Sequence, residues 1–186
     1  MAEEDKICKY IDIPLQHASD NILRSMRRQT TRKSIKETLA KLKAAMPDIH
    51  VRTTLIVGFP GETEDDYDQL LELVESERFS RLGVFTYSQE ENTVAAEMDN
   101  QIDEDIKQIR FDGVMRRQML ISSELNQEKI GKVFDVIVDS MDDDGSFIGR
   151  TRFDAPEIDN SVIFTSKNKL QPGDIVKVKI NDAFDY

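Results

Sequence analysis

The chain has 186 residues, of which 39% are hydrophobic and 33% charged, and its net charge at pH 7 is −11. This composition is typical of a globular protein with a modest core, and an acidic chain repels phosphate backbones, which disfavours broad nucleic-acid binding. No apolar run approaches the ~18 residues of a membrane span, and the acidic start "MAEEDK" does not resemble a basic secretory leader, so we expect a cytoplasmic protein.

Metal-ligating side chains are scarce. The chain has one cysteine, Cys8, and two histidines, His17 and His50. A single thiol excludes an internal disulfide and a cysteine-ligated zinc or iron–sulfur site built by this chain alone. We therefore expect no metal site here, and a buried, unreactive Cys8.

The first two thirds of the chain predict alternating strands and helices. Apolar runs predict three strands, over residues 10–13, 51–57 and 82–87. Apolar residues at helical spacing predict four helices, over about residues 20–28, 31–46, 63–79 and 103–129. The continuous run 51–57 favours a strand covered on both faces, and Thr63 with Asp66 fits a capping box. Three strand–helix units indicate a parallel sheet with right-handed crossovers.

The pattern changes after Gly131. Short alternating segments, separated by turn signals at residues 142–145 and 172–174, predict five short antiparallel strands. Such a series is typical of a small β-barrel. We therefore expect an α/β fold with two domains: βα units over residues 1–130 and an antiparallel barrel over residues 131–186.

A glycine loop follows the strand at residues 51–57. Ligands of parallel α/β proteins bind where strands end, and Gly58, Pro60 and Gly61 occupy that position. Glycine permits positive φ and close approach to a ligand, and Glu62 can accept hydrogen bonds from a ribose or an ammonium group. The alternative is that Pro-Gly is only a turn and Glu62 only an acid favoured by the helix dipole.

Two further loops follow the other predicted strands. Gln16 and His17 come just after the first strand, and Tyr87 ends the third. These side chains can line the same ligand pocket. The alternatives are an ordinary loop in which Ser19 caps a helix, and a tyrosine packed in the core.

Charge is distributed unevenly along the chain. Residues 24–43 carry eight basic side chains and one acidic side chain, whereas residues 133–186 carry eleven acidic and six basic ones. The acidic C-terminal region suits a basic partner, unless the acids serve only solubility. Basic residues on two amphipathic helices are usually a solvated face.

Four segments occur in the order of a known family. They are "YIDIPLQHASDNILRSMRR", "VRTTLIVGFPGETEDD", "VFTYSQEENTVAA" and "GRTRFDAPEID…PGDIVKVKI…AFDY". Together they resemble the methylthiotransferases of the radical S-adenosylmethionine superfamily, over nearly the whole chain. "IPLQHAS" and "DAPEID" resemble the branch that modifies a ribosomal protein more than the branch that modifies tRNA.

The resemblance implies a fold and a reaction. It implies the second half of a radical S-adenosylmethionine βα barrel, with three parallel βα units, followed by a small TRAM barrel of OB-like form. The family uses S-adenosylmethionine and two 4Fe–4S clusters to replace a carbon-bound hydrogen with a methylthio group, through a 5′-deoxyadenosyl radical. In this branch the target is the β-carbon of an aspartate in a small-subunit ribosomal protein, which the acidic TRAM region would recognise.

The resemblance also implies site residues. Gly58, Pro60, Gly61 and Glu62 would help to hold S-adenosylmethionine, with Gln16 and His17 at the pocket mouth. For the basic stretch 24–43, the alternative to a solvated face is that Arg27 or Arg28 pairs with the carboxylate of that ligand, because an arginine fork suits a carboxylate. Catalytic residues are not predicted.

The chain departs from the family pattern in two respects. The family's Cys-x-x-x-Cys-x-x-Cys motif is absent, so we expect a fragment that is inactive alone and whose open barrel edge self-associates. In the third loop, Asn92 stands where relatives often have glycine, a mild change because Asn tolerates the left-handed conformation. The alternatives are a tRNA methylthiotransferase and a non-catalytic substrate-binding module.

Overall fold

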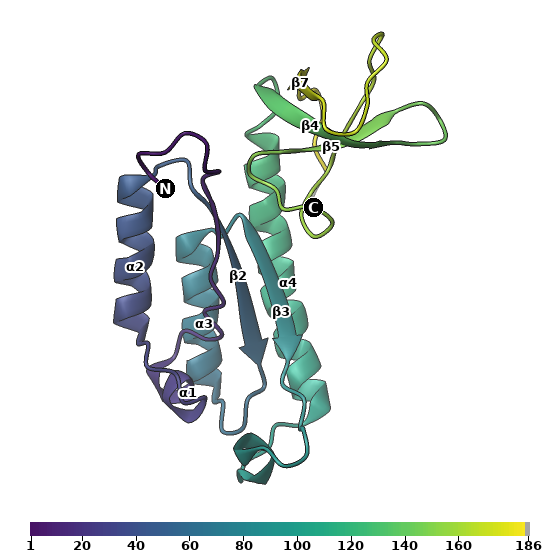
Figure 1. Cartoon of the computed structure of the whole chain (residues 1–186). Coiled ribbons are helices and arrows are strands. Elements are labelled where there is room, and N and C mark those ends of the chain that lie inside the picture. The colour runs from purple at the N-terminus through teal and green to yellow at the C-terminus, as the bar shows by residue number, and fades with distance from the viewer. Residues whose placement is uncertain (185–186) are drawn as a thin grey trace. The chain divides into compact units, whose positions relative to one another are not determined.

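Residues Ile11–Ile121 form one compact unit, and Met1–Tyr10 with the chain from Ser122 onward form a second (Figure 1). The structure is a computed structural model that describes residues 1–184. The chain passes from the first unit to the second within its longest helix.

The sheet of the first unit is parallel. Its strands are β1 (Tyr10–Asp12), β2 (His50–Val57) and β3 (Arg81–Thr86), in the order β1-β2-β3. β2 and β3 pair in parallel along their length, and a parallel bridge between Gln16 and Leu55 continues the pairing past β1. The predicted parallel βα arrangement is confirmed.

The helices of this unit are α1 (Asp20–Ser25), α2 (Arg32–Ala45), α3 (Glu64–Glu77) and α4 (Glu104–Gln127), with a short 3₁₀ helix η1 (Val94–Glu97). A side chain caps the start of each of the first three. The capping box of Thr63 and Asp66 is confirmed. Helix α1 ends at Ser25 rather than near residue 28, because Arg27 takes the left-handed conformation with φ of 57°.

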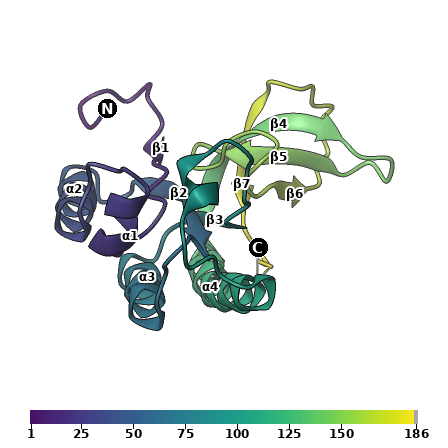
Figure 2. The ribbon, with the colours of Figure 1, turned by 90° about the horizontal axis from the view of Figure 1, so that it is seen from below.

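The helices cover one face of the sheet. In Figures 1 and 2, α3 and α4 lie along the same side of β2 and β3. Accordingly, Val51, Thr53, Leu55 and Val57 are buried while the residues between them are partly exposed. The expectation of a β2 strand covered on both faces is wrong for this unit, since no helix of it lies on the second face. Helices on one side of parallel strands form the wall of a βα barrel.

The second unit contains an antiparallel sheet. Its strands are β4 (Val133–Met141), β5 (Phe147–Thr151), β6 (Val162–Phe164) and β7 (Ile175–Lys179), in the order β6-β5-β4-β7. Val136, Val138 and Phe147 are buried. Within residues 1–184 the structure has four strands here rather than five, because the turn-forming residues of 152–161 leave that stretch irregular. The curled sheet confirms the small antiparallel β fold.

Candidate functional site

A cavity of about 370 Å³ opens where the parallel strands end. The loop after β1, the end of β2, the loop after β3 and η1 all contribute to its wall. Its lining includes Gln16, Arg27, Ile56, Phe59, Tyr87 and Met98. Its volume lies within the range of small-molecule sites.

Two residues of the cavity wall have unusual backbone conformations. Gln16 has φ of 73° and Arg27 has φ of 57°. Residues other than glycine rarely adopt positive φ, and such strain gathers at ligand sites. The backbone around the cavity is thus shaped at a cost in free energy of folding.

Two aromatic rings meet in the wall. The centroids of the Phe59 and Tyr87 rings lie 5.2 Å apart at an interplanar angle of 67°. Tyr87 is fixed at its backbone, where its N–H donates to the carbonyl of Val57 over 2.8 Å. The edge-to-face pair gives the cavity an apolar surface with fixed geometry.

The glycine loop is held by its own glutamate. Gly58 has φ of 72°, and its N–H donates to Oε2 of Glu62 over 2.8 Å. The N–H of Glu62 donates to the carbonyl of Phe59 over 2.9 Å. A Cβ at Gly58 would lie 2.3 Å from Cγ of Lys107, so a larger residue does not fit. The loop therefore depends on glycine both for its backbone angle and for its contact with α4.

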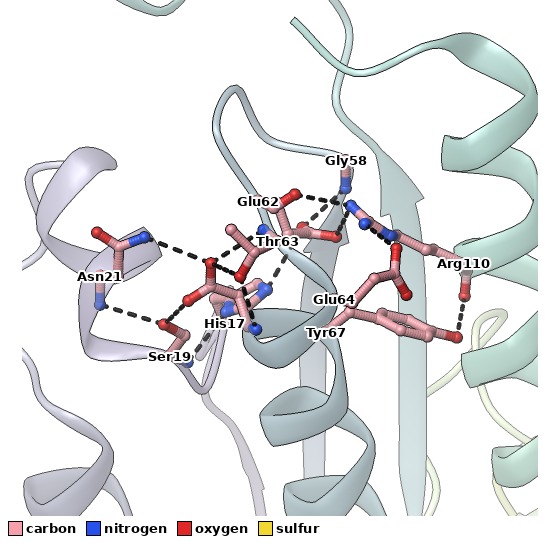
Figure 3. A network of polar contacts seen from close by, with 10 residues as sticks. His17, Ser19, Asn21, Gly58, Glu62, Thr63, Glu64, Tyr67 and Arg110 are labelled. Carbon is pink, nitrogen blue, oxygen red and sulfur yellow. Dashed lines mark hydrogen bonds and ion pairs between the residues drawn. The ribbon is translucent and has the colours of Figure 1, made fainter. Parts of the chain in front are cut away.

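Glu62 lies at the centre of a buried polar network (Figure 3). The residue is 3% exposed, and its Oε1 accepts a hydrogen bond of 2.9 Å from a guanidinium nitrogen of Arg110. The same nitrogen reaches the Glu62 carbonyl at 3.1 Å, and the second one reaches Glu64 at 2.5 Å. Both carboxylate oxygens of Glu62 are thus engaged by protein groups.

His17 approaches the same carboxylate from the loop after β1. The ring is fully buried, and its Nδ1 accepts a hydrogen bond of 3.0 Å from the N–H of Ser19. An accepting Nδ1 puts the ring proton on Nε2, which lies 3.4 Å from Oε2 of Glu62. Glu62 therefore contacts three segments of the chain.

Asp66 joins the starts of two helices. Its carboxylate accepts hydrogen bonds from the side chain of Ser19, from the backbone and side chain of Thr63, and from Asn21. Burial raises the pKa of Asp66, but these hydrogen bonds outweigh burial and leave its pKa below 3.8. The ionised form of Asp66 therefore stabilises the loop after β1.

The predicted site residues take two different places. Gln16 lines the cavity, and Gly58, Pro60 and Gly61 form the loop that carries Phe59 into it. His17 and Glu62 belong instead to the buried network, with their side chains turned to protein atoms. Direct contact of these two side chains with a ligand remains a prediction.

The sequence did not lead us to the contribution of α4. Lys107, Arg110, Val114, Gln118 and Ile121 are buried at helical spacing. The three polar members donate to backbone carbonyls of Tyr87, Glu62 and Phe79. The sequence analysis singled out none of these polar residues, because a polar side chain in a helix gives no sign of the buried partner that it will contact.

Metal ligands do not gather in the part of the chain that the structure describes. Within residues 1–184 no group of three or more His, Cys, Asp or Glu side chains is placed to hold a metal ion. Cys8 is exposed, which corrects the expectation of a buried thiol, because the residues before β1 form no regular element that would enclose it. No helix among the described residues is long and apolar enough to cross a membrane.

Comparison with known proteins places both units in sequence families. The radical SAM superfamily profile matches residues 1–74, and the TRAM domain profile matches residues 130–186. The chain is 50% identical over 188 aligned residues to the ribosomal protein uS12 methylthiotransferase RimO of Desulforamulus reducens, with all of this chain and 42% of that protein covered. It is 48% identical to RimO of Clostridioides difficile, with 98% of this chain and 41% of that protein covered.

The chain belongs to the radical S-adenosylmethionine methylthiotransferase family. RimO of Flavobacterium johnsoniae, 47% identical over 187 residues, covers all of this chain with 43% of its own length. The chain thus spans about two fifths of the length of the curated relatives it matches. The family assignment agrees with the parallel βα wall and the antiparallel sheet described above.

Proposed function

We propose that this chain forms the C-terminal part of an enzyme that methylthiolates an aspartate β-carbon of ribosomal protein uS12. The observation that carries this proposal is the cavity at the ends of β2 and β3, in a chain about half identical to proteins named as uS12 methylthiotransferases. Within the proposed enzyme, residues 1–130 are the end of the barrel and residues 131–186 the TRAM domain.

S-adenosylmethionine fits the chemistry of the cavity wall. Phe59, Tyr87 and Ile56 offer apolar surface for an adenine ring, and Arg27 in the same wall offers a guanidinium for a carboxylate. The loop of Gly58–Glu62 shapes this wall by carrying Phe59. When bound, S-adenosylmethionine and the family's iron–sulfur clusters would supply the radical chemistry, and residues of this chain would bind and orient the nucleoside.

The clusters have no ligand set in this chain. Its sequence has one cysteine, too few for a three-thiolate cluster site. We therefore propose that cluster ligands come from outside these 186 residues and that this chain alone has no methylthiotransferase activity. Anaerobic incubation of the chain with iron, sulfide and S-adenosylmethionine should produce no cluster absorbance, and a stable, active cluster would refute the proposal.

A basic protein suits the C-terminal unit. Residues 133–186 carry a net charge of −5, and an acidic surface steers basic partners toward it. Ribosomal proteins are typically basic, and an enzyme that modifies one works in the cytoplasm. β1 and β3 are the outer strands of the parallel sheet, so we expect the isolated chain to self-associate by pairing at these edges.

The test uses the complete polypeptide that contains this chain. After anaerobic reconstitution, it is incubated with uS12 and S-adenosylmethionine, and the modified peptide is sequenced by mass spectrometry. We expect one methylthio group in place of one hydrogen, on an aspartate. Modification of tRNA with no change in uS12 would favour the tRNA-modifying alternative, and binding of uS12 without modification would favour the non-catalytic module.

A further inference from the structure

Arg110 of α4 holds the glycine loop from outside the strand ends. Its side chain is 6% exposed, and one guanidinium nitrogen contacts both the carbonyl and Oε1 of Glu62. Glu62 in turn accepts from the N–H of Gly58 through its other oxygen. The contacts therefore run without a gap from α4 through Glu62 to the first residue of the loop (Figure 3).

The charges of this chain of contacts balance only when Arg110 is present. Glu62 is completely buried at its side chain, and the His17 ring, whose Nδ1 accepts a hydrogen bond, brings no positive charge to it. Glu64 contacts the outer nitrogen of Arg110, but the Glu64 side chain is 79% exposed. Removing the guanidinium would leave a buried carboxylate without its compensating charge, which is costly.

Lys107, one turn before Arg110 on α4, is a second buried cation. Nζ of Lys107 donates to the carbonyl of Tyr87 over 3.0 Å, and Lys107 is 2% exposed. Lys107 thus fixes the loop after β3, which carries Tyr87, while Arg110 fixes the loop after β2, which carries Phe59. The two rings that these loops bring together are the ones in contact in the cavity wall.

We propose that Arg110 is a positioning residue that holds the Gly58–Glu62 loop, and hence Phe59, in the conformation that binds the S-adenosyl ligand. This inference rests on the proposed function for the identity of the ligand, but not for the anchoring of the loop. Glu62 then acts through the backbone of its loop and does not contact the ligand. Arg110 itself lies outside the residues that line the cavity.

The experiment compares four variants of the 186-residue chain: Arg110→Gln, Arg110→Lys and two controls. Arg110→Gln removes the contact with Glu62. Glu64→Gln removes only the charge on the exposed side of the guanidinium, and Arg117→Gln removes a half-exposed ion pair with Glu75 on the same helix. Amide hydrogen exchange reports on the loop, because the N–H of Gly58 donates to Glu62 itself. Calorimetric titration with S-adenosylhomocysteine reports on the ligand site.

In Arg110→Gln, we expect exchange of the Gly58 and Glu62 amides to accelerate about tenfold or more, with β2 residues unchanged. We expect the affinity for S-adenosylhomocysteine to fall by about tenfold, and both control variants to stay within about twofold of the parent. Arg110→Lys should recover part of both losses, because lysine restores the charge but not the second contact. If Arg110→Gln does not fold, the same comparison is made with Arg110→Lys.

The outcomes separate the inference from the function on which it rests. Unchanged exchange at Gly58 in Arg110→Gln would overturn the inference. Faster exchange with unchanged affinity would also overturn it, because the loop conformation would then not matter to the ligand. A parent chain that binds no S-adenosylhomocysteine, with exchange accelerated in Arg110→Gln, would refute the proposed ligand and leave the anchoring of the loop supported.

Discussion

Gly58→Ala should destabilise the Ile11–Ile121 unit far more than an ordinary loop substitution. Two costs add at this position. Alanine at φ of 72° is strained in the left-handed conformation, which costs about 1–2 kcal/mol of folding free energy. Its Cβ would also lie 2.3 Å from Cγ of Lys107, where carbon atoms normally stay about 3.5–4.0 Å apart.

The second cost is that of overpacking a buried side chain. Lys107 is 2% exposed and tied to the Tyr87 carbonyl, so its stem has little freedom to move aside. Overpacking of this kind costs about 1–3 kcal/mol, which brings the expected loss for Gly58→Ala to about 2–5 kcal/mol.

Gly61→Ala is the matched control. Gly61 has φ of 82°, but an added Cβ there meets nothing within 4 Å. It should therefore cost only the backbone strain of about 1–2 kcal/mol. Lys107→Ala removes Cγ and leaves only the Lys107 Cβ, at 3.1 Å from the added carbon. In that background most of the excess cost of Gly58→Ala over Gly61→Ala should disappear.

The assay is urea unfolding followed by far-ultraviolet circular dichroism, because most helical residues lie in this unit. The free energies of unfolding are compared across the two glycine variants with and without Lys107→Ala, as a double-mutant cycle. A cost of Gly58→Ala no greater than that of Gly61→Ala would refute the clash with Lys107. An excess cost that is undiminished after Lys107→Ala would refute it as well.

Three further predictions concern Asp66, the TRAM region and the isolated chain. Asp66→Asn should lose about 1–3 kcal/mol of unfolding free energy at neutral pH, because an amide cannot accept all the hydrogen bonds that Asp66 receives. Since the folded-state pKa of Asp66 is lowered, this contribution is present above pH 3.8 and disappears as pH falls further. The unfolding free energies of the parent and Asp66→Asn, measured by urea titration, should therefore converge in acid. A difference that stays constant with pH would contradict the role given to the Asp66 carboxylate. Affinity of the complete polypeptide for uS12 should fall as salt rises, and an affinity independent of salt would rule out steering by the acidic TRAM region. Light scattering should find the isolated chain self-associated, whereas a monodisperse monomer would count against pairing at the open edges of the sheet.

The strand–helix order was predictable because it depends on local patterns. The apolar run that became β2 and the capping box at Thr63 and Asp66 need only a few neighbouring residues to be recognised. Asn92 was identified as a residue suited to the left-handed conformation, and its φ is 64°. The glycine loop was located for the same reason, since Gly58 and Gly61 follow a clear strand.

The partners of Glu62 were not predictable from such patterns. Arg110 lies 48 residues beyond Glu62, and nothing in the spacing of α4 indicates which of its cations points inward. The sequence suggested Glu62 as a ligand contact, which remains a prediction, but it gave no sign of the hydrogen bonds from Arg110 and Gly58 to the Glu62 carboxylate. The predicted two-sided cover of β2 failed similarly, because an apolar run reports hydrophobicity but not which face the helices will occupy.

The most direct test of the account is a crystal structure of the complete polypeptide bound to S-adenosylhomocysteine. We expect density for the nucleoside against Phe59 and Tyr87, with the ligand carboxylate near Arg27 and the Glu62 side chain still paired with Arg110. Density for the ligand away from the ends of β2 and β3 would contradict the account.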